Sequence, residues 1–200
     1  MEKLSELKQK FEEKRPVKWE MIPDIPLNKN QVVMYMPRQL VGTEGEDDIT
    51  SAMINNYIKD AVMPRANGKT YSREHIAYLT AISILKKSLS VKDIKTLIDL
   101  SEGSGETAQY YESLNASLDK ELTQAAARLR DDMSQKEIVD LALQLAVSVY
   151  ARRTLCEQLM QILTEQIAAE QQAEKEKAKE EAKKKETAKK TDDAAEEKSE

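Results

Sequence analysis

Residues 49–100 read ITSAMINNYIKDAVMPRANGKTYSREHIAYLTAISILKKSLSVKDIKTLIDL, and they decide the fold. Thr50 or Ser51 can cap a helix that runs to about Val62, because a side-chain oxygen there accepts a hydrogen bond from the first turn. Asn-Gly at positions 67 and 68 is the strongest short-range signal for a two-residue hairpin turn. Ser72 and Ser90 each precede apolar residues at helical spacing. The segment therefore predicts a helix, a tight basic turn and two more helices.

The residues before this segment predict a short helix and an extended strap. Residues 1–16 form a charged helix candidate, which the proline at its end stops. Residues 17–28 favour extended chain because their two prolines do not continue a helix. Asn28 can cap a further helix over residues 29–40. The apolar anchors of the strap are Trp19, Ile22, Ile25 and Leu27.

The C-terminal half predicts two long helices and a charged tail. Residues 106–131 and the stretch after Ser134 each carry apolar side chains at helical spacing, and such helices must bury that face. They can pair within one chain or meet a second chain in a dimer. The sequence therefore predicts four parts. Residues 1–16 form an N-terminal helix, and residues 17–102 form a winged helix-turn-helix domain with its strap. Residues 106–166 form a helical bundle or dimerisation region, and residues 167–200 form a charged tail that is disordered or a fraying helix.

Composition predicts a mainly α-helical protein in a reducing compartment such as the cytoplasm. Five glycines, five prolines and few aromatic residues are typical of helical proteins. One cysteine does not form a disulfide within the chain. The N-terminus has no apolar stretch typical of a signal peptide, and no apolar run is long enough to predict a membrane span.

Charge is unevenly distributed along the chain. The formal net charge is −5, which by itself disfavours nucleic acid as a partner. Between Ile49 and Lys95, however, eight basic residues face three acidic ones, which leaves a local excess of five positive charges. A local positive field can bind phosphate even on an acidic protein.

The order of the central elements resembles the winged helix-turn-helix domain of mercury-resistance-type (MerR-type) regulators. In that family a recognition helix is followed by a short basic wing and two further helices. The resemblance covers about residues 29–100. The matching pieces are Tyr57, Pro64-Arg65, Asn67-Gly68, Tyr71-Ser72 and Leu89-Ser90-Val91-Lys92-Asp93-Ile94. The resemblance implies a cytoplasmic DNA-binding transcription regulator, in which residues 50–62 enter the major groove and residues 64–71 contact the backbone.

A second resemblance covers more of the chain. Residues 18–150 are similar to an uncharacterised family from Gram-positive bacteria, domain of unknown function 1836. The similar pieces are Trp19, Ile22-Pro23-Asp24-Ile25, Met53-Ile54-Asn55-Asn56-Tyr57 and Tyr71-Ser72-Arg73-Glu74-His75-Ile76. The chain departs from the MerR-type pattern in two places. Asn55-Asn56 stands where that family has arginine before its tyrosine pair, and Lys69-Thr70 stands where its wing has arginine between tyrosines.

The predicted DNA contacts lie on one helix and the turn after it. Ser51, Asn55 and Lys59 share a face of the helix, while Ile54 and Ile58 take the opposite face. Asparagine can read adenine in the major groove, and basic residues interleaved with tyrosines suit phosphate and sugar contacts. The alternatives are a solvated polar face, and a Tyr71 ring that packs in the core. The full predicted set is Ser51, Asn55, Asn56, Tyr57, Lys59, Arg65, Lys69, Tyr71 and Arg73.

No sequence motif predicts catalysis, a metal site or a cofactor. His75 is the one histidine, and a helix-start polar role suits it better than metal binding. Cys156 lies on an apolar stripe and is predicted to act as a small buried side chain. The expected partners are double-stranded DNA and a second copy of the chain, with no membrane contact. The alternative function is a protein-interaction module built on the same fold, since a fold does not fix a function.

Overall fold

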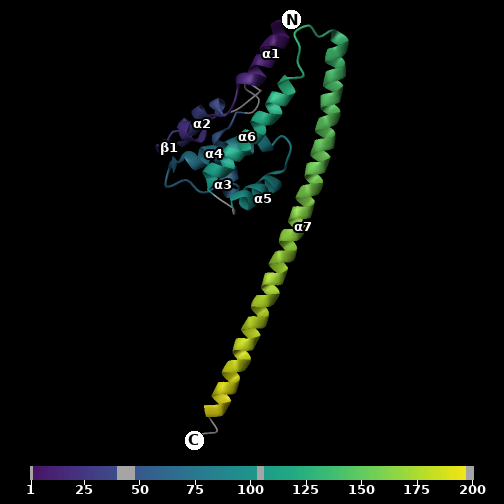
Figure 1. Ribbon diagram of the computed structural model, residues 1–200. Helices are drawn as coiled ribbons and strands as arrows, with labels where there is room; N and C mark the ends of the chain where they lie inside the picture. The colour runs from purple at the N-terminus through teal and green to yellow at the C-terminus, as the bar shows by residue number, and fades with distance from the viewer. Residues whose placement is uncertain (1, 40–47, 103–105, 197–200) are drawn as a thin grey trace. The chain divides into compact units, whose positions relative to one another are not determined.

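The computed structural model describes residues 2–39, 48–102 and 106–196, and these are mainly α-helical. This confirms the predicted fold class. The described residues form seven α-helices, two short 3-10 helices and one two-stranded sheet (Figure 1). In chain order the elements are α1 (Glu2–Glu13), η1 (Trp19–Met21), β1 (Leu27–Asn28), α2 (Lys29–Tyr35), η2 (Met36–Arg38), α3 (Ser51–Lys59), β2 (Thr70–Tyr71), α4 (Arg73–Leu85), α5 (Val91–Glu102), α6 (Thr107–Ala126) and α7 (Gln135–Glu196).

Helix α4 is the centre of the core. Every residue from His75 to Ser83 is buried, and a helix that is buried all round must be covered on each side. It packs against β2, η2, α5 and α6. The hydroxyl groups of Thr80 and Ser83 donate to the carbonyls of Ile76 and Leu79, at 2.8 and 2.7 Å, so they carry no unmet hydrogen-bond donor into the core.

The strap is fixed to the core by a small buried hydrogen-bond network. The Tyr111 hydroxyl donates to the Val17 carbonyl at 2.6 Å, and the Val17 amide donates to Oε1 of Gln39 at 2.9 Å. Burial raises the pKa of Tyr111 above its usual value. Ile22 and Leu27 are buried as predicted, whereas the Ile25 side chain is 63% exposed, so the prediction that it anchors the strap was wrong. The strap is therefore anchored on both sides of an exposed middle.

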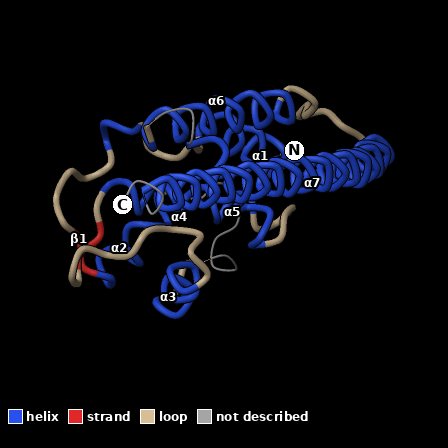
Figure 2. The backbone as a smooth tube through the Cα atoms, turned by 90° about the horizontal axis from the view of Figure 1, so that it is seen from below, coloured by secondary structure: helices blue, strands red, loops and turns tan. Residues whose placement is uncertain are grey.

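The sheet joins the strap to the end of the predicted turn. β1 pairs antiparallel with β2, with Leu27 opposite Tyr71 and Asn28 opposite Thr70 (Figure 2, red). Thr70 also forms a bridge to Asn67 across the turn. The hairpin is therefore supported by the strap through β1, a non-local pairing that the sequence analysis did not predict.

Helix α3 ends in a left-handed residue that is not glycine. Ala61 has φ +54°, and the amides of Ala61 and Val62 donate to the carbonyls of Ile58 and Tyr57 at 3.1 and 2.9 Å. These two bonds form a Schellman motif, in which the residue after the C-cap usually is glycine because the Cβ of any other residue is strained there. The motif turns the chain from α3 toward the hairpin.

We expect Ala61→Gly to raise the free energy of unfolding by about 1 kcal/mol, because glycine removes the left-handed strain at this exposed position. Urea denaturation of the full chain measures the change. The matched control is Ala116→Gly, an exposed residue in the middle of α6, which we expect to lower stability by about 0.5–1 kcal/mol. Equal losses in both variants would contradict the role assigned to Ala61.

The helices α1 and α6 lie side by side, so α6 packs against α1 as well as α4 (Figure 1). Arg15 links them, because its guanidinium donates to Asp119 at 2.6 Å, to Thr123 at 3.2 Å and to the Phe11 carbonyl at 2.7 Å. From its sequence, α6 was predicted to pair with the last helix or with a second chain. In the structure α1, which was predicted as an N-terminal helix with no assigned neighbour, packs against one side of α6.

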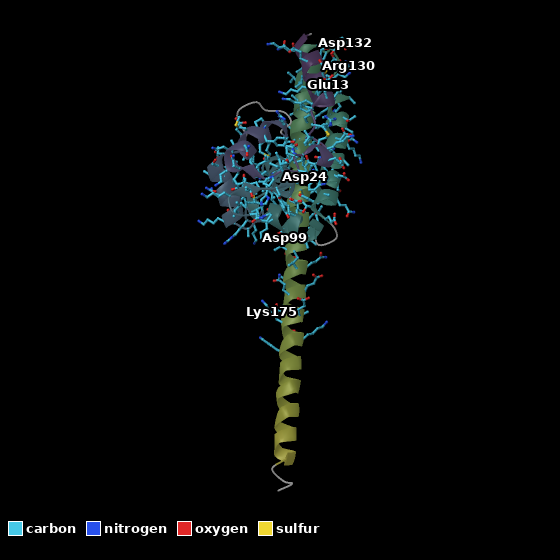
Figure 3. All side chains as sticks on the ribbon, turned by 90° about the vertical axis from the view of Figure 1, so that its left-hand side faces the viewer. Glu13, Asp24, Asp99, Arg130, Asp132 and Lys175 are labelled. Carbon is cyan, nitrogen blue, oxygen red and sulfur yellow. The ribbon has the colours of Figure 1, made fainter. Side chains whose placement is uncertain are left out.

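The loop before α7 is held by paired charges. Arg130, which Figure 3 labels beside Asp132, pairs with Asp132 at 3.3 Å and also with Glu137. Ser134 accepts a hydrogen bond from the Glu137 amide at 3.3 Å and donates its own amide to the Glu137 carboxylate at 2.7 Å, which confirms the predicted cap. The Ser134 amide and hydroxyl both donate to the Glu137 carboxylate, and together with Arg130 they lower the pKa of Glu137 to about 2.

Helix α7 extends through the predicted charged tail. It continues through Glu196, where a disordered tail or a fraying helix was expected from residue 167. Alanine, lysine and glutamate all favour the helical state, and Lys/Glu pairs four residues apart stabilise it further. The chain divides into two compact units inside this helix, Met1–Val149 and Tyr150–Glu200.

Candidate nucleic-acid interface

Helix α3 turns a polar face to solvent. Ser51, Asn55, Asn56 and Lys59 are exposed, while Ile54 is fully buried. The Met53 amide donates to the Thr50 side-chain oxygen at 3.2 Å, which confirms Thr50 as the cap. The predicted spacing thus places amide and ammonium groups together on an accessible helical face.

Asn55 is joined to a residue that the sequence analysis missed. The Lys29 ammonium donates to Oδ1 of Asn55 at 2.5 Å, which links the start of α2 to the middle of α3. Lys29 lies outside the segment from Ile49 to Lys95 that has the local excess of positive charge. Its one sequence signal is its position directly after the capping residue Asn28. In this arrangement the Asn55 oxygen is occupied, while its amide nitrogen keeps two donors.

The hairpin turn differs from the predicted one by a single position. Asn67 and Thr70 exchange two backbone hydrogen bonds, at 3.0 and 3.1 Å, so Gly68 and Lys69 are the central residues. Of the described residues in this turn, Gly68 alone has positive φ, at +63°, as in a type II′ turn. The predicted turn needed positive φ at both Asn67 and Gly68 and was wrong. The shift puts the exposed Lys69 side chain at the tip.

Two separate hollows gather the basic side chains. One of about 560 Å³ is lined by Lys29, Asn30, Gly68 and Lys69, so it brings the start of α2 to the hairpin tip. Another of about 380 Å³ is lined by Lys59 and Arg65, with Asp99 of α5 on its wall. Lys29 therefore pairs with the predicted Lys69, and the predicted Lys59 pairs with Arg65. The Asp99 carboxylate weakens the positive potential of the second pair.

Three of the residues that were predicted to contact DNA have largely buried side chains. The Tyr57 and Tyr71 rings are 8% and 3% exposed, and burial raises the pKa of Tyr57. Tyr71 meets His75 edge to face, with ring centres 5.4 Å apart. The Arg73 side chain is 19% exposed and lies over the Trp19 ring. These three side chains shape the domain, and we leave them out of the proposed DNA contacts.

His75 has a structural role at the start of α4. Its Nδ1 accepts from the Ser72 amide at 3.0 Å, so Nε2 carries the proton and donates to the Arg65 carbonyl at 3.3 Å. Burial lowers the pKa of His75 below its usual value of 6.5. The neutral ring thus ties the residue before the hairpin to the helix after it.

We expect the free energy of unfolding to fall as pH drops from about 7.5 to about 5.5, because the unfolded chain takes up the His75 proton before the folded chain does. The stabilising contribution is fully present above pH 6.5 and is lost as pH falls through the lowered pKa. His75 is the only histidine, so few other side chains titrate in this window. In His75→Gln the amide oxygen can still accept the capping hydrogen bond, and urea denaturation should show a much flatter pH dependence. The same slope in both proteins would contradict this role.

Among residues 2–39, 48–102 and 106–196, no group of three or more His, Cys, Asp or Glu side chains is placed to hold a metal ion. Within the same ranges, no helix has a stretch both long and apolar enough to cross a bilayer.

Part of the chain is similar to a known protein family. Residues 17–115 match the model of a family described as a domain of unknown function (DUF1836). The match begins in the strap and ends in α6, so it covers the core and both basic hollows. No curated protein and no solved structure matches the chain.

Proposed function

We propose that this chain, whose residues 17–115 match the model of that family of unknown function, is a DNA-binding transcription regulator of the MerR-like winged-helix type. The observation that carries the proposal is the exposed polar face of α3, which Lys29 connects to the same side of the domain as the Lys69 hairpin tip. The order of α2, α3, hairpin, α4 and α5 supports it, because that order is typical of winged helix-turn-helix domains.

In this proposal the two elements act differently on DNA. The polar face of α3 enters the major groove, where Asn55 and Asn56 donate to acceptor atoms on base edges. Lys69 and Arg65 contact phosphates, which positions the domain without selecting a sequence. Displacement of Lys29 by a phosphate would free the Asn55 oxygen to accept from adenine.

A second copy of the chain is the proposed partner of α7. Val139, Leu143, Val147 and Tyr150 are spaced four, four and three residues apart, so they share one face, and they are 59%, 63%, 59% and 73% exposed. A helix that exposes a continuous row of large apolar side chains is stabilised when a partner covers them. A dimer also suits the two-fold symmetry of many operators.

The charges around this face favour an antiparallel pair. Residues 141–151 contain no charged side chain, with Glu137 and Asp140 before them and Arg152 and Arg153 after them. Antiparallel packing about Ala146 places Asp140 of one copy beside Arg152 of the other. Parallel packing instead brings the arginines of the two copies together, which is unfavourable.

The test of DNA binding is selection from a random duplex library with the purified full chain at low salt, followed by anisotropy titration of the enriched sequences. We expect enrichment of a defined motif. Asn55→Ala should change the preferred bases, whereas Lys69→Ala should weaken the binding of all duplex sequences to a similar extent. Lys120→Ala, which removes an exposed lysine from α6, is the control and should change neither. Failure to bind any duplex at low salt would refute the proposal.

The alternative function is a protein-interaction module on the same surface. The net charge of −5 and the 79% exposed Met34 of α2 favour it, because an exposed apolar side chain suits a protein partner. A protein partner whose binding is lost in Asn55→Ala, together with no DNA binding, would select this alternative.

A further inference from the structure

A cavity between the strap and the start of α4 has no role in the function proposed above. It measures about 380 Å³ and is lined by Asp24, Ile25 and Pro26 on one side and by Tyr71, Arg73 and His75 on the other. These residues all belong to the segment that matches the family. Figure 3 labels Asp24, which lines this cavity, and Asp99, which lines the separate hollow of Lys59 and Arg65.

The Arg73 guanidinium in this cavity packs on an aromatic ring, but its hydrogen-bond donors are not all paired. It lies 5.4 Å from the centre of the Trp19 ring, and the side chain is 19% exposed. Its Nε is buried and has no hydrogen-bond partner in the part of the chain that the structure describes. A buried donor without a partner is destabilising, and a charged one more so.

Asp24 forms only a weak ion pair with Arg73. The distance from Nη2 of Arg73 to Oδ2 of Asp24 is 3.6 Å, which is longer than a hydrogen bond, and the Asp24 side chain is 86% exposed. An exposed carboxylate at this distance is easily displaced. A ligand oxyanion could then form the short, paired hydrogen bonds for which guanidinium is shaped.

The walls of the cavity define the class of ligand. Ile25, Pro26 and the Tyr71 ring are apolar, so the site pairs one cation with a hydrophobic surface. Arg73 is recessed, whereas Lys69 at the hairpin tip is exposed. A recessed cation suits a small free molecule better than the backbone of a duplex.

We propose that this cavity binds a small organic anion, in which a carboxylate or phosphate group pairs with Arg73 and an apolar group packs against Ile25 and Pro26. The site requires neither the polar face of α3 nor the second copy of the chain. Its success or failure is therefore separate from that of the proposed DNA binding.

Trp19 provides the measurement, because it is the only tryptophan and it contacts Arg73. The full chain is titrated with benzoate and with inorganic phosphate while tryptophan fluorescence is recorded. We expect a saturable change with at least one probe, and about tenfold or more weaker binding in Arg73→Gln. Asp24→Asn removes the competing carboxylate from an exposed position and should tighten binding several-fold. Arg38→Gln removes an exposed arginine that lies outside this cavity and outside both basic hollows, so it is the matched control and should leave the titration unchanged.

Circular dichroism of Arg73→Gln shows whether the variant is folded, and Asp24→Asn provides an independent result if it is not. No saturable change with either probe would overturn the proposal, as would identical titrations of the original chain and Asp24→Asn. A fluorescence change with duplex DNA but with neither small anion would also overturn it, since Arg73 would then serve the DNA backbone.

Discussion

Raising the salt concentration from about 50 mM to about 200 mM will weaken the binding of duplex DNA roughly 100-fold. Binding of basic side chains to phosphates releases counterions, and each phosphate adds about −0.9 to the slope of log affinity against log salt. Lys29, Lys59, Arg65 and Lys69 line the two basic hollows and together predict a slope of about −3.6. Anisotropy titrations at several salt concentrations measure the slope.

Single substitutions show which of these cations contact phosphate. Lys59→Ala, Arg65→Ala and Lys69→Ala should each make the slope shallower by about 0.9, because each removes one contact. Lys120→Ala carries the same loss of charge on α6 and should leave the slope unchanged. A shallow slope in the original chain, or an equal effect of Lys120→Ala, would mean that the two hollows do not hold the DNA backbone.

Capping residues were the part of the fold that the sequence predicted best. Asn28, Thr50, Ser72 and Ser134 each begin a helix in the structure as expected. Capping is local, because the capping side chain and the amide that it accepts from lie within three residues of each other. The periodicity of apolar residues was equally informative, and it placed Ile54 in the core and Asn55 outside it.

Contacts between distant segments were the part that the sequence did not predict. β1 and β2 have two residues each, so neither carries a strand pattern, and their pairing depends on where the strap lies. Lys29 meets Asn55 for the same reason, since the two are brought together only by the packing of α2 on α3. Of the predicted contact residues, Tyr57 follows the buried Ile54 by three positions, so helical periodicity alone would have placed its ring inside.

The second large effect concerns α7. We expect the original chain to be dimeric at micromolar concentration and Leu143→Glu/Val147→Glu to be monomeric, with a dissociation constant at least about 100-fold higher. Each of these side chains is about three-fifths exposed in the single chain, and burial of one such side chain contributes about 1.5–3 kcal/mol. A glutamate at either position would place an unpaired carboxylate in the interface. Glutamate is a good helix former, so the circular dichroism spectrum should not change.

Sedimentation equilibrium across a range of concentrations measures both dissociation constants. The matched control is Gln171→Glu/Gln172→Glu, which adds two negative charges to exposed polar positions of the same helix and should remain dimeric. A third variant tests the antiparallel arrangement, because Asp140→Arg brings like charges together only if Asp140 faces Arg152 of the other copy. Asp140→Arg/Arg152→Asp exchanges the two charges and should restore the dimer. A monomeric original chain would leave the apolar face of α7 to a different protein, and a failed rescue would exclude the antiparallel register about Ala146.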